Sequence, residues 1–113
     1  MARLNYVELP SAAFAASKAF YTDVFAMPLV DYGLTYSCTI SGNVDIGLQG
    51  DSVSASAAPL PVIGVDDLEA TLKAVENAGG TIIKPIFSFP GGRRFHFRDP
   101  SGNELAAWVE TKG

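Results

Sequence analysis

One order of predicted elements, a strand, a helix and three strands, occurs twice along the chain, and this repeat constrains the fold most strongly. The first copy covers about residues 3–50 and the second about residues 59–110. Each copy places a Gly-Asn pair just before its last strand, at Gly42-Asn43 and at Gly102-Asn103. We therefore expect an α+β fold in which two βαβββ modules in tandem form a curved mixed sheet around a cleft, which is the natural place for a ligand.

In the first copy, a strand over Leu4–Leu9 is expected to stop at Pro10, and Ser11 can serve as the N-cap of the next helix. The spacing in that helix predicts an apolar stripe that faces a sheet and ends near Met27-Pro28. Its members are Phe14, Ser17, Tyr21, Val24 and Phe25. Turn residues then separate three short predicted strands at 29–32, 35–41 and 44–49.

The second copy begins after residues 50–59, which are small and polar and predict a linker. A strand over Pro61–Val65 precedes a helix for which Asp66 and Glu69 have the spacing of a capping box. Leu68, Leu72 and Val75 share one face of this helix, and Gly79-Gly80 is expected to end it. Strands are predicted at 81–86, 93–98 and 105–109. At 113 residues, the chain is expected to form a single domain over 1–113.

Composition excludes several classes of function. Twelve acidic and eight basic residues give a net charge of −4, so nucleic acid is not an expected partner. No apolar run approaches the length of a membrane span, and the first ten residues lack the apolar region of a secretory signal. We therefore expect no membrane partner and a cytoplasmic location. The single cysteine, Cys38, cannot form an internal disulfide and is interpreted as a packing residue.

Four segments together resemble the vicinal oxygen chelate superfamily, which includes glyoxalase I, the bleomycin-resistance proteins and the extradiol dioxygenases. They are Tyr6-Val-Glu-Leu-Pro, Lys18-Ala-Phe-Tyr-Thr-Asp-Val-Phe, Gly64-Val-Asp-Asp-Leu-Glu-Ala-Thr-Leu and Phe95-His-Phe-Arg-Asp-Pro-Ser-Gly-Asn-Glu-Leu. The resemblance covers roughly residues 3–110 and implies a glyoxalase-like fold of paired βαβββ modules. It also implies a homodimer, because small members of the family usually dimerise.

The resemblance indicates where a metal would be bound. In metal-using members, His, Gln or Glu ligands come from the first and last strands of each module. These four positions fall on Tyr6, Asp45, Leu60 and Ala106, and a slip of one residue would replace Asp45 with Ile46. At most one of the four could bind a divalent ion, whereas a catalytic site needs about three protein ligands. We therefore expect no metal and no other cofactor.

Apart from the family resemblance, residue type and strand position leave one alternative metal site to consider. Glu8 and Glu104 lie two residues from Tyr6 and Ala106 in their strands, so they share the same strand faces. Together with Asp45 they could form an unusual acidic site for a divalent metal.

Strand alternation predicts which side chains face the cleft. In the last strand, Leu105, Ala107 and Val109 are expected to face the helices, which leaves Glu104, Ala106 and Trp108 for the cleft. In the preceding strand, Phe95 and Phe97 are expected on the helix side. The predicted ligand-binding residues are Tyr6, Asp45, Arg94, His96, Glu104 and Trp108.

Three functions are compatible with these residues. The leading hypothesis is a metal-free protein that binds a small, partly aromatic or amphiphilic molecule in the cleft. The second is a lyase or isomerase in which His96, Tyr6 and Glu8 are the catalytic acid–base residues, or in which the acidic site holds a metal. The third is an accessory domain that acts by dimerising with a protein partner, which no sequence feature favours.

Overall fold

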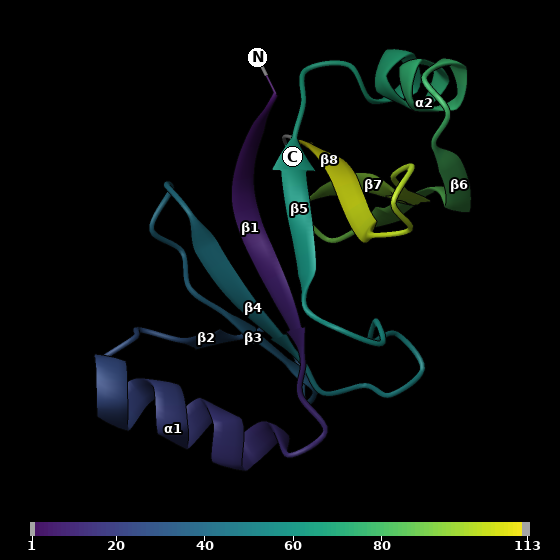
Figure 1. Cartoon of the computed structure of the whole chain (residues 1–113). Helices are drawn as coiled ribbons and strands as arrows, with labels where there is room; N and C mark the ends of the chain where they lie inside the picture. The colour runs from purple at the N-terminus through teal and green to yellow at the C-terminus, as the bar shows by residue number, and fades with distance from the viewer. Residues whose placement is uncertain (1, 112–113) are drawn as a thin grey trace. The chain divides into compact units, whose positions relative to one another are not determined.

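The computed structural model of the chain describes residues 2–111 (Figure 1). The elements follow the predicted order, a βαβββ module and then a second one. They are β1 (Arg3–Pro10), α1 (Phe14–Phe25), β2 (Val30–Asp31), β3 (Tyr36–Cys38), β4 (Asp45–Gln49), β5 (Leu60–Gly64), α2 (Leu68–Asn77), β6 (Thr81–Phe89), β7 (Gly92–Arg98) and β8 (Glu104–Glu110). The chain forms two compact units, which are described separately: an N-terminal unit of residues 6–60, and a C-terminal unit of residues 2–5 and 61–111.

The N-terminal unit has its strands in the order β2-β3-β4-β1. Strands β1 and β4 run parallel, with Tyr6 opposite Asp45 and Glu8 opposite Gly47, whereas β3 is antiparallel to both β2 and β4. Helix α1 packs against β4. Strand β1 includes Pro10, the residue at which the sequence predicted that the strand would stop.

Helix α1 differs from its prediction at its N-terminus and on its apolar stripe. Ala13 is the N-cap without a side-chain hydrogen bond, and the Ser11 hydroxyl instead donates to the Leu9 carbonyl oxygen at 3.0 Å, so the predicted Ser11 cap is wrong. No residue of α1 is buried, and Val24 and Phe25 are 57% and 59% exposed. Of the predicted stripe, Phe14, Ser17 and Tyr21 are half-buried, whereas its last two residues are exposed.

The C-terminal unit has the strand order β5-β8-β7-β6, with β5 and β8 parallel and the other pairs antiparallel. Helix α2 packs against β6, β7 and β8. Leu68 of α2, Phe95 of β7 and Ala107 of β8 form the buried core, each at most 2% exposed, and Phe97 and Val109 pack against them. The predicted alternation of β7 and β8 is confirmed, because their helix-facing residues are the apolar ones.

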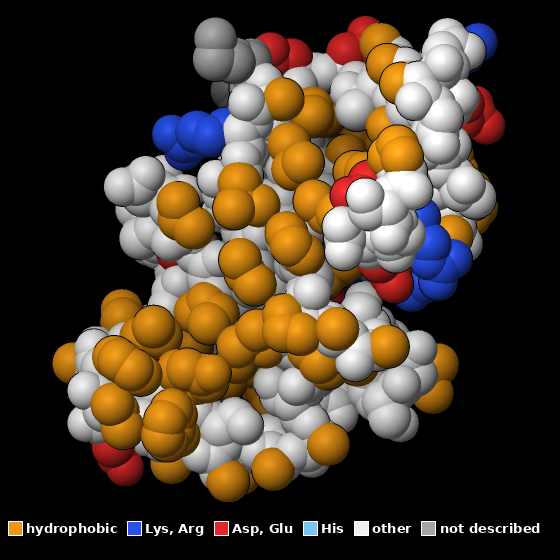
Figure 2. All heavy atoms as spheres, viewed as in Figure 1, with side chains coloured by type: hydrophobic (Ala, Val, Ile, Leu, Met, Phe, Trp, Pro, Cys, Tyr) orange, Lys and Arg blue, Asp and Glu red, His pale blue; other side chains and the backbone are white. Residues whose placement is uncertain are grey.

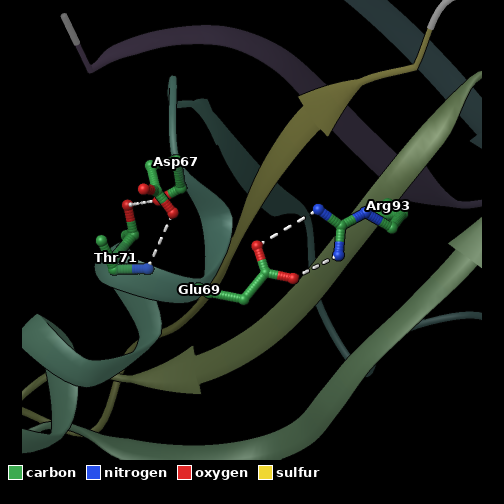
Figure 3. A network of polar contacts seen from close by, with 5 residues as sticks. Asp67, Glu69, Thr71 and Arg93 are labelled. Carbon is green, nitrogen blue, oxygen red and sulfur yellow. Dashed lines mark hydrogen bonds and ion pairs between the residues drawn. The ribbon is translucent and has the colours of Figure 1, made fainter.

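Asp67 caps α2 instead of the predicted Asp66. The Asp67 carboxylate accepts a hydrogen bond from the Ala70 backbone N–H at 3.0 Å, and the Thr71 hydroxyl donates to the Asp67 carbonyl oxygen at 2.7 Å (Figure 3). Glu69 forms a bidentate ion pair with Arg93 of β7, in which the two guanidinium nitrogens lie 2.5 and 3.2 Å from the carboxylate oxygens (Figure 3). The predicted capping box of Asp66 and Glu69 therefore does not form, and Glu69 instead links the helix to β7.

Strand β6 is an edge strand whose pairing with β7 is irregular. Lys84 lies opposite His96, but the register shifts both before this pair and after it, ahead of the pair Phe87–Arg94. Pro85 lies in the second irregular stretch, and proline cannot donate a backbone hydrogen bond to a neighbouring strand. The proline therefore interrupts the ladder beside His96.

Both helices are short, 12 residues for α1 and 10 for α2. Helix α2 is followed by Gly79 at a φ of +96°, the predicted left-handed stop. Within residues 2–111, no helix is long and apolar enough to cross a membrane.

Candidate functional site

In the C-terminal unit, four predicted site residues share the sheet face opposite α2. Arg94 lies opposite Trp108 across the β7–β8 pair, and His96 lies two residues along the same strand. Glu104 of β8 reaches His96 through a hydrogen bond. Because Phe95 and Ala107 turn toward α2, strand alternation places these polar and aromatic residues on the other face.

Four rings follow one another along this face and are here named the ring row: Trp108, Phe89, Phe87 and His96. Successive ring centroids lie 6.2, 6.4 and 5.9 Å apart, which is typical of contacting aromatic side chains. The Arg94 guanidinium lies over Phe87 at 5.3 Å and over Phe89 at 5.5 Å. Sequence analysis missed Phe87 and Phe89, although their spacing of two residues is the signal for one strand face.

His96 ends the ring row and is completely buried, at 0% exposure. Its Nδ1 lies 2.9 Å from the Glu104 carboxylate. Burial lowers the pKa of His96, as do the positive charges of Arg94 and Lys84, whereas Glu104 acts in the opposite direction. The lowered pKa favours the neutral ring, in which Nδ1 carries the proton and donates it to Glu104, and among the described residues nothing forms a hydrogen bond with Nε2.

A groove of about 420 Å³ lies at the Trp108 end of the ring row. The indole N–H of Trp108 donates to the Asn5 side-chain oxygen at 2.9 Å, which fixes the ring as one wall. Asn5 lies over Gly64, where a Cβ atom would come within 2.6 Å of the Asn5 amide nitrogen. The residues around the groove include Arg3, Asn5, Gly64, Asp66, Trp108 and Glu110. No sequence feature indicated that Asn5 and Gly64 line a groove, because their proximity depends on the pairing of distant strands.

The N-terminal unit holds the other predicted acid–base residues, Tyr6 and Glu8, in a hydrogen-bonded chain. The Tyr36 hydroxyl donates to the Glu8 carboxylate at 3.1 Å and also contacts the Tyr6 hydroxyl. Glu8 is only 3% exposed. Both hydroxyls lie where a Cβ at position 47 would stand, so only glycine fits there. Sequence analysis missed Tyr36, whose hydroxyl joins Tyr6 to Glu8.

Burial dominates the electrostatics of this chain of hydroxyls. It raises the pKa of Tyr6 far above its usual value, with further contributions from Tyr36 and Cys38. Burial likewise raises the pKa of Tyr36, and the negative charge of Glu8 adds to the effect. Both tyrosines therefore stay protonated. Because Tyr36 donates to Glu8, its oxygen is left to accept from Tyr6, and the chain runs from Tyr6 through Tyr36 to Glu8.

Asp45, the remaining predicted binding residue, is engaged in the turn between β3 and β4. Its carboxylate accepts hydrogen bonds from the Thr39 hydroxyl and the Ser41 backbone N–H, both at 2.7 Å, and from the Gly42 N–H at 3.3 Å. Burial alone would raise the pKa of Asp45, but these hydrogen bonds lower it overall. The carboxylate thus stabilises its own turn.

The side chains at the family's metal positions do not fit a divalent ion. Leu60 and Ala106 offer no donor atom, Tyr6 is protonated and hydrogen-bonded, and Asp45 is used by its turn. Over the range 2–111, no three His, Cys, Asp or Glu side chains are grouped closely enough to hold a metal. This donor set supplies fewer than the three ligands that a catalytic site needs.

Two curated relatives are similar over most of the chain. They are proteins from Mycobacterium bovis and Mycobacterium tuberculosis, each named provisionally as a glyoxylase, CFP32. Both are 29% identical over 127 aligned positions, which cover 96% of this chain and 46% of the relative. The chain thus spans about half the length of the curated relatives it matches.

Solved structures share the fold. A methylmalonyl-CoA epimerase from Mycobacterium tuberculosis has a TM-score of 0.75 at 15% identity, over 96% of this chain and 88% of that one. The Mn(II)-bound glyoxalase from Novosphingobium aromaticivorans has a TM-score of 0.70 at 21% identity, over 96% of this chain and 40% of that one. At such low identity, these similarities confirm the predicted glyoxalase-like fold and nothing finer.

The family model of the Glyoxalase/Bleomycin resistance protein/Dioxygenase superfamily matches residues 3–107. This range contains both βαβββ modules except for the last residues of β8. The chain therefore belongs to the glyoxalase/bleomycin resistance protein/dioxygenase superfamily, as the sequence resemblance implied.

Proposed function

We propose that the protein binds a small, planar, amphiphilic organic molecule at the groove beside Trp108 in the C-terminal unit. The observation that carries this proposal is a groove of about 420 Å³ with a half-buried tryptophan as one wall. This volume lies within the usual range for small-molecule sites, roughly 300 to 1,000 Å³. Arg3, Asp66 and Glu110 give the groove charged groups of both signs, as an amphiphilic ligand requires.

The ring row supports an aromatic rather than an aliphatic ligand. It continues from Trp108 through Phe89 and Phe87, and these side chains are half-buried instead of packed in the core. Flat rings present large contact area with few rotatable bonds, which favours binding of another flat ring. Family membership allows this function but does not select it, because the superfamily's fold hosts binding proteins and enzymes alike.

The test is a titration of the purified protein with 2-naphthol, 2-naphthoate and naphthalene, followed by the fluorescence of Trp108, the only tryptophan. We expect saturable quenching by the amphiphilic probes. Binding measured by calorimetry should weaken at least tenfold in Trp108→Leu and stay unchanged in Lys73→Ala, an exposed change on α2. No saturable binding of any probe would overturn the proposal.

We further propose that this binding requires no metal. The support is the donor chemistry of the four family positions, where leucine, alanine and a protonated tyrosine replace the usual ligands. Probe affinity should be the same before and after dialysis against EDTA, and after addition of Ni²⁺, Zn²⁺, Mn²⁺ or Fe²⁺. Restoration of binding by one of these ions after EDTA would contradict the proposal, as would near-stoichiometric metal in the purified protein.

A second candidate is an acid–base enzyme, a lyase or isomerase, favoured by the chain from Tyr6 through Tyr36 to Glu8. A proton delivered to Tyr6 could pass along these hydroxyls, because each oxygen would accept one proton as it releases another, and would end on the Glu8 carboxylate. One structural neighbour is named as a methylmalonyl-CoA epimerase, so methylmalonyl-CoA in D₂O is a direct probe. Deuterium should enter at its α-carbon with the native protein and not with Tyr6→Phe.

The variant His96→Ala distinguishes an enzyme that uses the tyrosine chain from one that uses His96 as its acid–base residue. Exchange that depends on pH and is lost in a folded His96→Ala variant would assign the acid–base role to His96. Full exchange in that variant would eliminate the histidine mechanism and leave the tyrosine chain. Absence of exchange in the native protein would count against both.

We also propose that the protein is a homodimer that uses the apolar surface of its N-terminal unit. Phe20, Val24 and Phe25 of α1 are each more than half exposed, and so is Tyr32 after β2. Figure 2 shows hydrophobic side chains gathered over α1 and the neighbouring strands. Such a large exposed apolar surface is typical of an interaction site.

A second copy of the chain is the partner that this surface favours. Lys18 forms an ion pair with Asp31 at 2.7 Å. Because the two charges neutralise each other, neither of them favours a partner of opposite charge. In a two-fold dimer the same patch meets itself, which an apolar surface tolerates. Light scattering should give about twice 11.9 kDa, and Phe25→Ser should lower this mass, whereas Val53→Ser in the linker should not. A mass near 11.9 kDa for the native protein at working concentration would refute the dimer.

The cytoplasm is the compartment we propose, supported by the state of Cys38. This single cysteine is free and half-buried, and burial raises the pKa of its thiol. A single cysteine without a disulfide partner in the chain fits a reducing compartment, where disulfides are rare. Fractionation of the source cells with an antibody to the protein would test this location.

A further inference from the structure

The buried ring of His96 has one nitrogen that the described protein leaves without a hydrogen bond. His96 is 0% exposed, and Nε2 has no partner among residues 2–111. An unsatisfied buried acceptor destabilises a folded protein, because it has lost its hydrogen bonds to water and gained none in the protein. An apolar ring would avoid this penalty, as Phe95 and Phe97 do on the same strand. The orphan nitrogen therefore indicates a partner supplied from outside the chain.

Glu104 determines which ring nitrogen of His96 is left without a hydrogen-bond partner. Its carboxylate accepts a hydrogen bond from Nδ1 at 2.9 Å, so the proton of the neutral ring is on Nδ1. Nε2 then carries a lone pair and can only accept. The missing partner must be a hydrogen-bond donor.

The strand pairing is irregular next to this nitrogen. His96 lies opposite Lys84 on the edge strand β6, and the pairing is irregular on both sides of that residue pair. Pro85 removes one donor from the ladder at this point. Phe87, the neighbour of His96 in the ring row, is half-buried and lies just after the irregularity. Because the ladder is interrupted here, fewer backbone hydrogen bonds hold this edge beside His96 than a regular strand pair would have.

We propose that the ligand is a hydroxylated aromatic molecule whose ring lies along the ring row and whose hydroxyl donates a hydrogen bond to His96 Nε2. This inference rests on the proposed binding function and narrows its ligand class to phenol-like compounds. The rings run from Trp108 through Phe89 and Phe87 to His96, with the Arg94 guanidinium over the two phenylalanines, and the row ends on one acceptor. A site of this kind rejects an analogue that lacks the donor, because the buried acceptor is then left unpaired.

The charged groups around His96 preserve its accepting form. Arg94 on the same strand and Lys84 on β6 oppose a positive charge on the ring, and Glu104 on β8 holds the Nδ1 proton. Near neutral pH the site therefore presents a lone pair to the ligand.

The experiment compares 2-naphthol with 2-methoxynaphthalene, which has the same ring system but no donor. Calorimetric affinities are measured for the native protein, for His96→Asn and for the exposed control Glu76→Gln. Asparagine can still donate to Glu104 but has no atom at the place of Nε2. We expect native protein and control to prefer 2-naphthol by about tenfold, the size of one neutral hydrogen bond, and His96→Asn to show no preference.

A spectroscopic readout on the unmodified protein does not depend on how the variant folds. Because His96 is the only histidine, ¹⁵N-histidine labelling gives one imidazole signal pair. We expect an acceptor-type Nε2 that shifts toward stronger hydrogen bonding with 2-naphthol and not with 2-methoxynaphthalene. A proton on Nε2, or an Nε2 already bonded to water and unchanged by the probe, would overturn the inference. Equal affinity for both probes would overturn it while leaving the proposed binding function in place, whereas no binding of either would overturn both.

Discussion

The two units share one order of elements but use their helices differently. In the C-terminal unit, α2 supplies Leu68 to a core with Phe95, and both side chains are at most 1% exposed. In the N-terminal unit, α1 buries no residue, and its Phe20 and Phe25 are 54% and 59% exposed. Two copies of one topology can therefore differ in where they place their apolar side chains.

This difference shows that an apolar stripe on a helix does not by itself indicate whether the stripe packs in the core or stays exposed. The stripe of α1 contains aromatic rings and that of α2 only aliphatic side chains, yet α2 forms the core. Helix α2 lies across three strands of seven to nine residues, whereas β2 and β3 of the other unit have two and three residues. A short sheet offers less surface to bury a helix, so part of the α1 stripe remains available to a partner.

The largest expected effect tests this contrast directly. Phe95→Ala should lower the free energy of unfolding by about 3 to 5 kcal/mol, because it leaves a cavity in the core of the C-terminal unit. Phe20→Ala should change it by no more than about 0.5 kcal/mol at concentrations where the chain is a monomer. Urea denaturation followed by circular dichroism measures both. Similar losses for the two variants would show that α1 is packed as tightly as α2.

The sequence predicted the order of the elements and the alternation of the last two strands. Periodicity is a local property, so the apolar positions 95, 97, 107 and 109 could be placed on the helix side from residue spacing alone. The caps were less predictable. Two neighbouring aspartates compete for the N-cap of α2, and only the backbone conformation selects Asp67 over Asp66.

The second prediction concerns a glycine whose role depends on tertiary pairing. Gly47→Ala should destabilise the N-terminal unit by roughly 1 to 3 kcal/mol, because the new Cβ collides with the hydroxyls of Tyr6 and Tyr36. The loss should shrink in a Tyr6→Phe, Tyr36→Phe background, where both hydroxyls are gone. A double-mutant cycle by urea denaturation measures this coupling. Additive effects would show that the hydroxyls do not occupy this space.

Such contacts also explain why the candidate sites were only partly predictable. Tyr6, Glu8, His96 and Glu104 could be proposed from residue type and strand face. Their actual partners, among them Tyr36, depend on which distant strands lie side by side. No motif in one sequence reports that pairing, so the hydroxyl chain and the groove emerge only from the fold.

A smaller effect is expected at the cap that distinguishes α2 from α1. Asp67→Ala should lower the free energy of unfolding by about 1 kcal/mol, because the carboxylate satisfies the Ala70 N–H. Asp67→Asn is the matched control and should cost much less, since asparagine also caps helices well. Thermal and urea unfolding of both variants measure the difference. Equal losses would mean that the negative charge, rather than the cap hydrogen bond, stabilises α2.

The smallest effect we expect is a pH dependence that belongs to the C-terminal unit alone, because the chain's only histidine is there. Burial lowers the pKa of His96 in the folded state, so the unfolded chain, with an ordinary pKa near 6.5, binds the proton more readily. Stability should therefore be fully present above about pH 7 and decrease as the pH falls through the unfolded value. Glu104 opposes the shift and keeps the effect small.

His96→Gln isolates this contribution, because glutamine keeps a polar side chain but does not titrate. Between pH 7.5 and 5.5, the free energy of unfolding from urea titrations should fall more steeply for the native protein than for the variant. The reverse order would mean that Glu104 outweighs burial and that the folded histidine holds its proton more tightly than the unfolded one. In that case Nε2 would be a donor, and the same measurement would also contradict the proposed recognition of a ligand hydroxyl. The dependence of stability on pH thus tests whether the buried His96 ring keeps a lone pair on Nε2, which the proposed hydrogen bond requires.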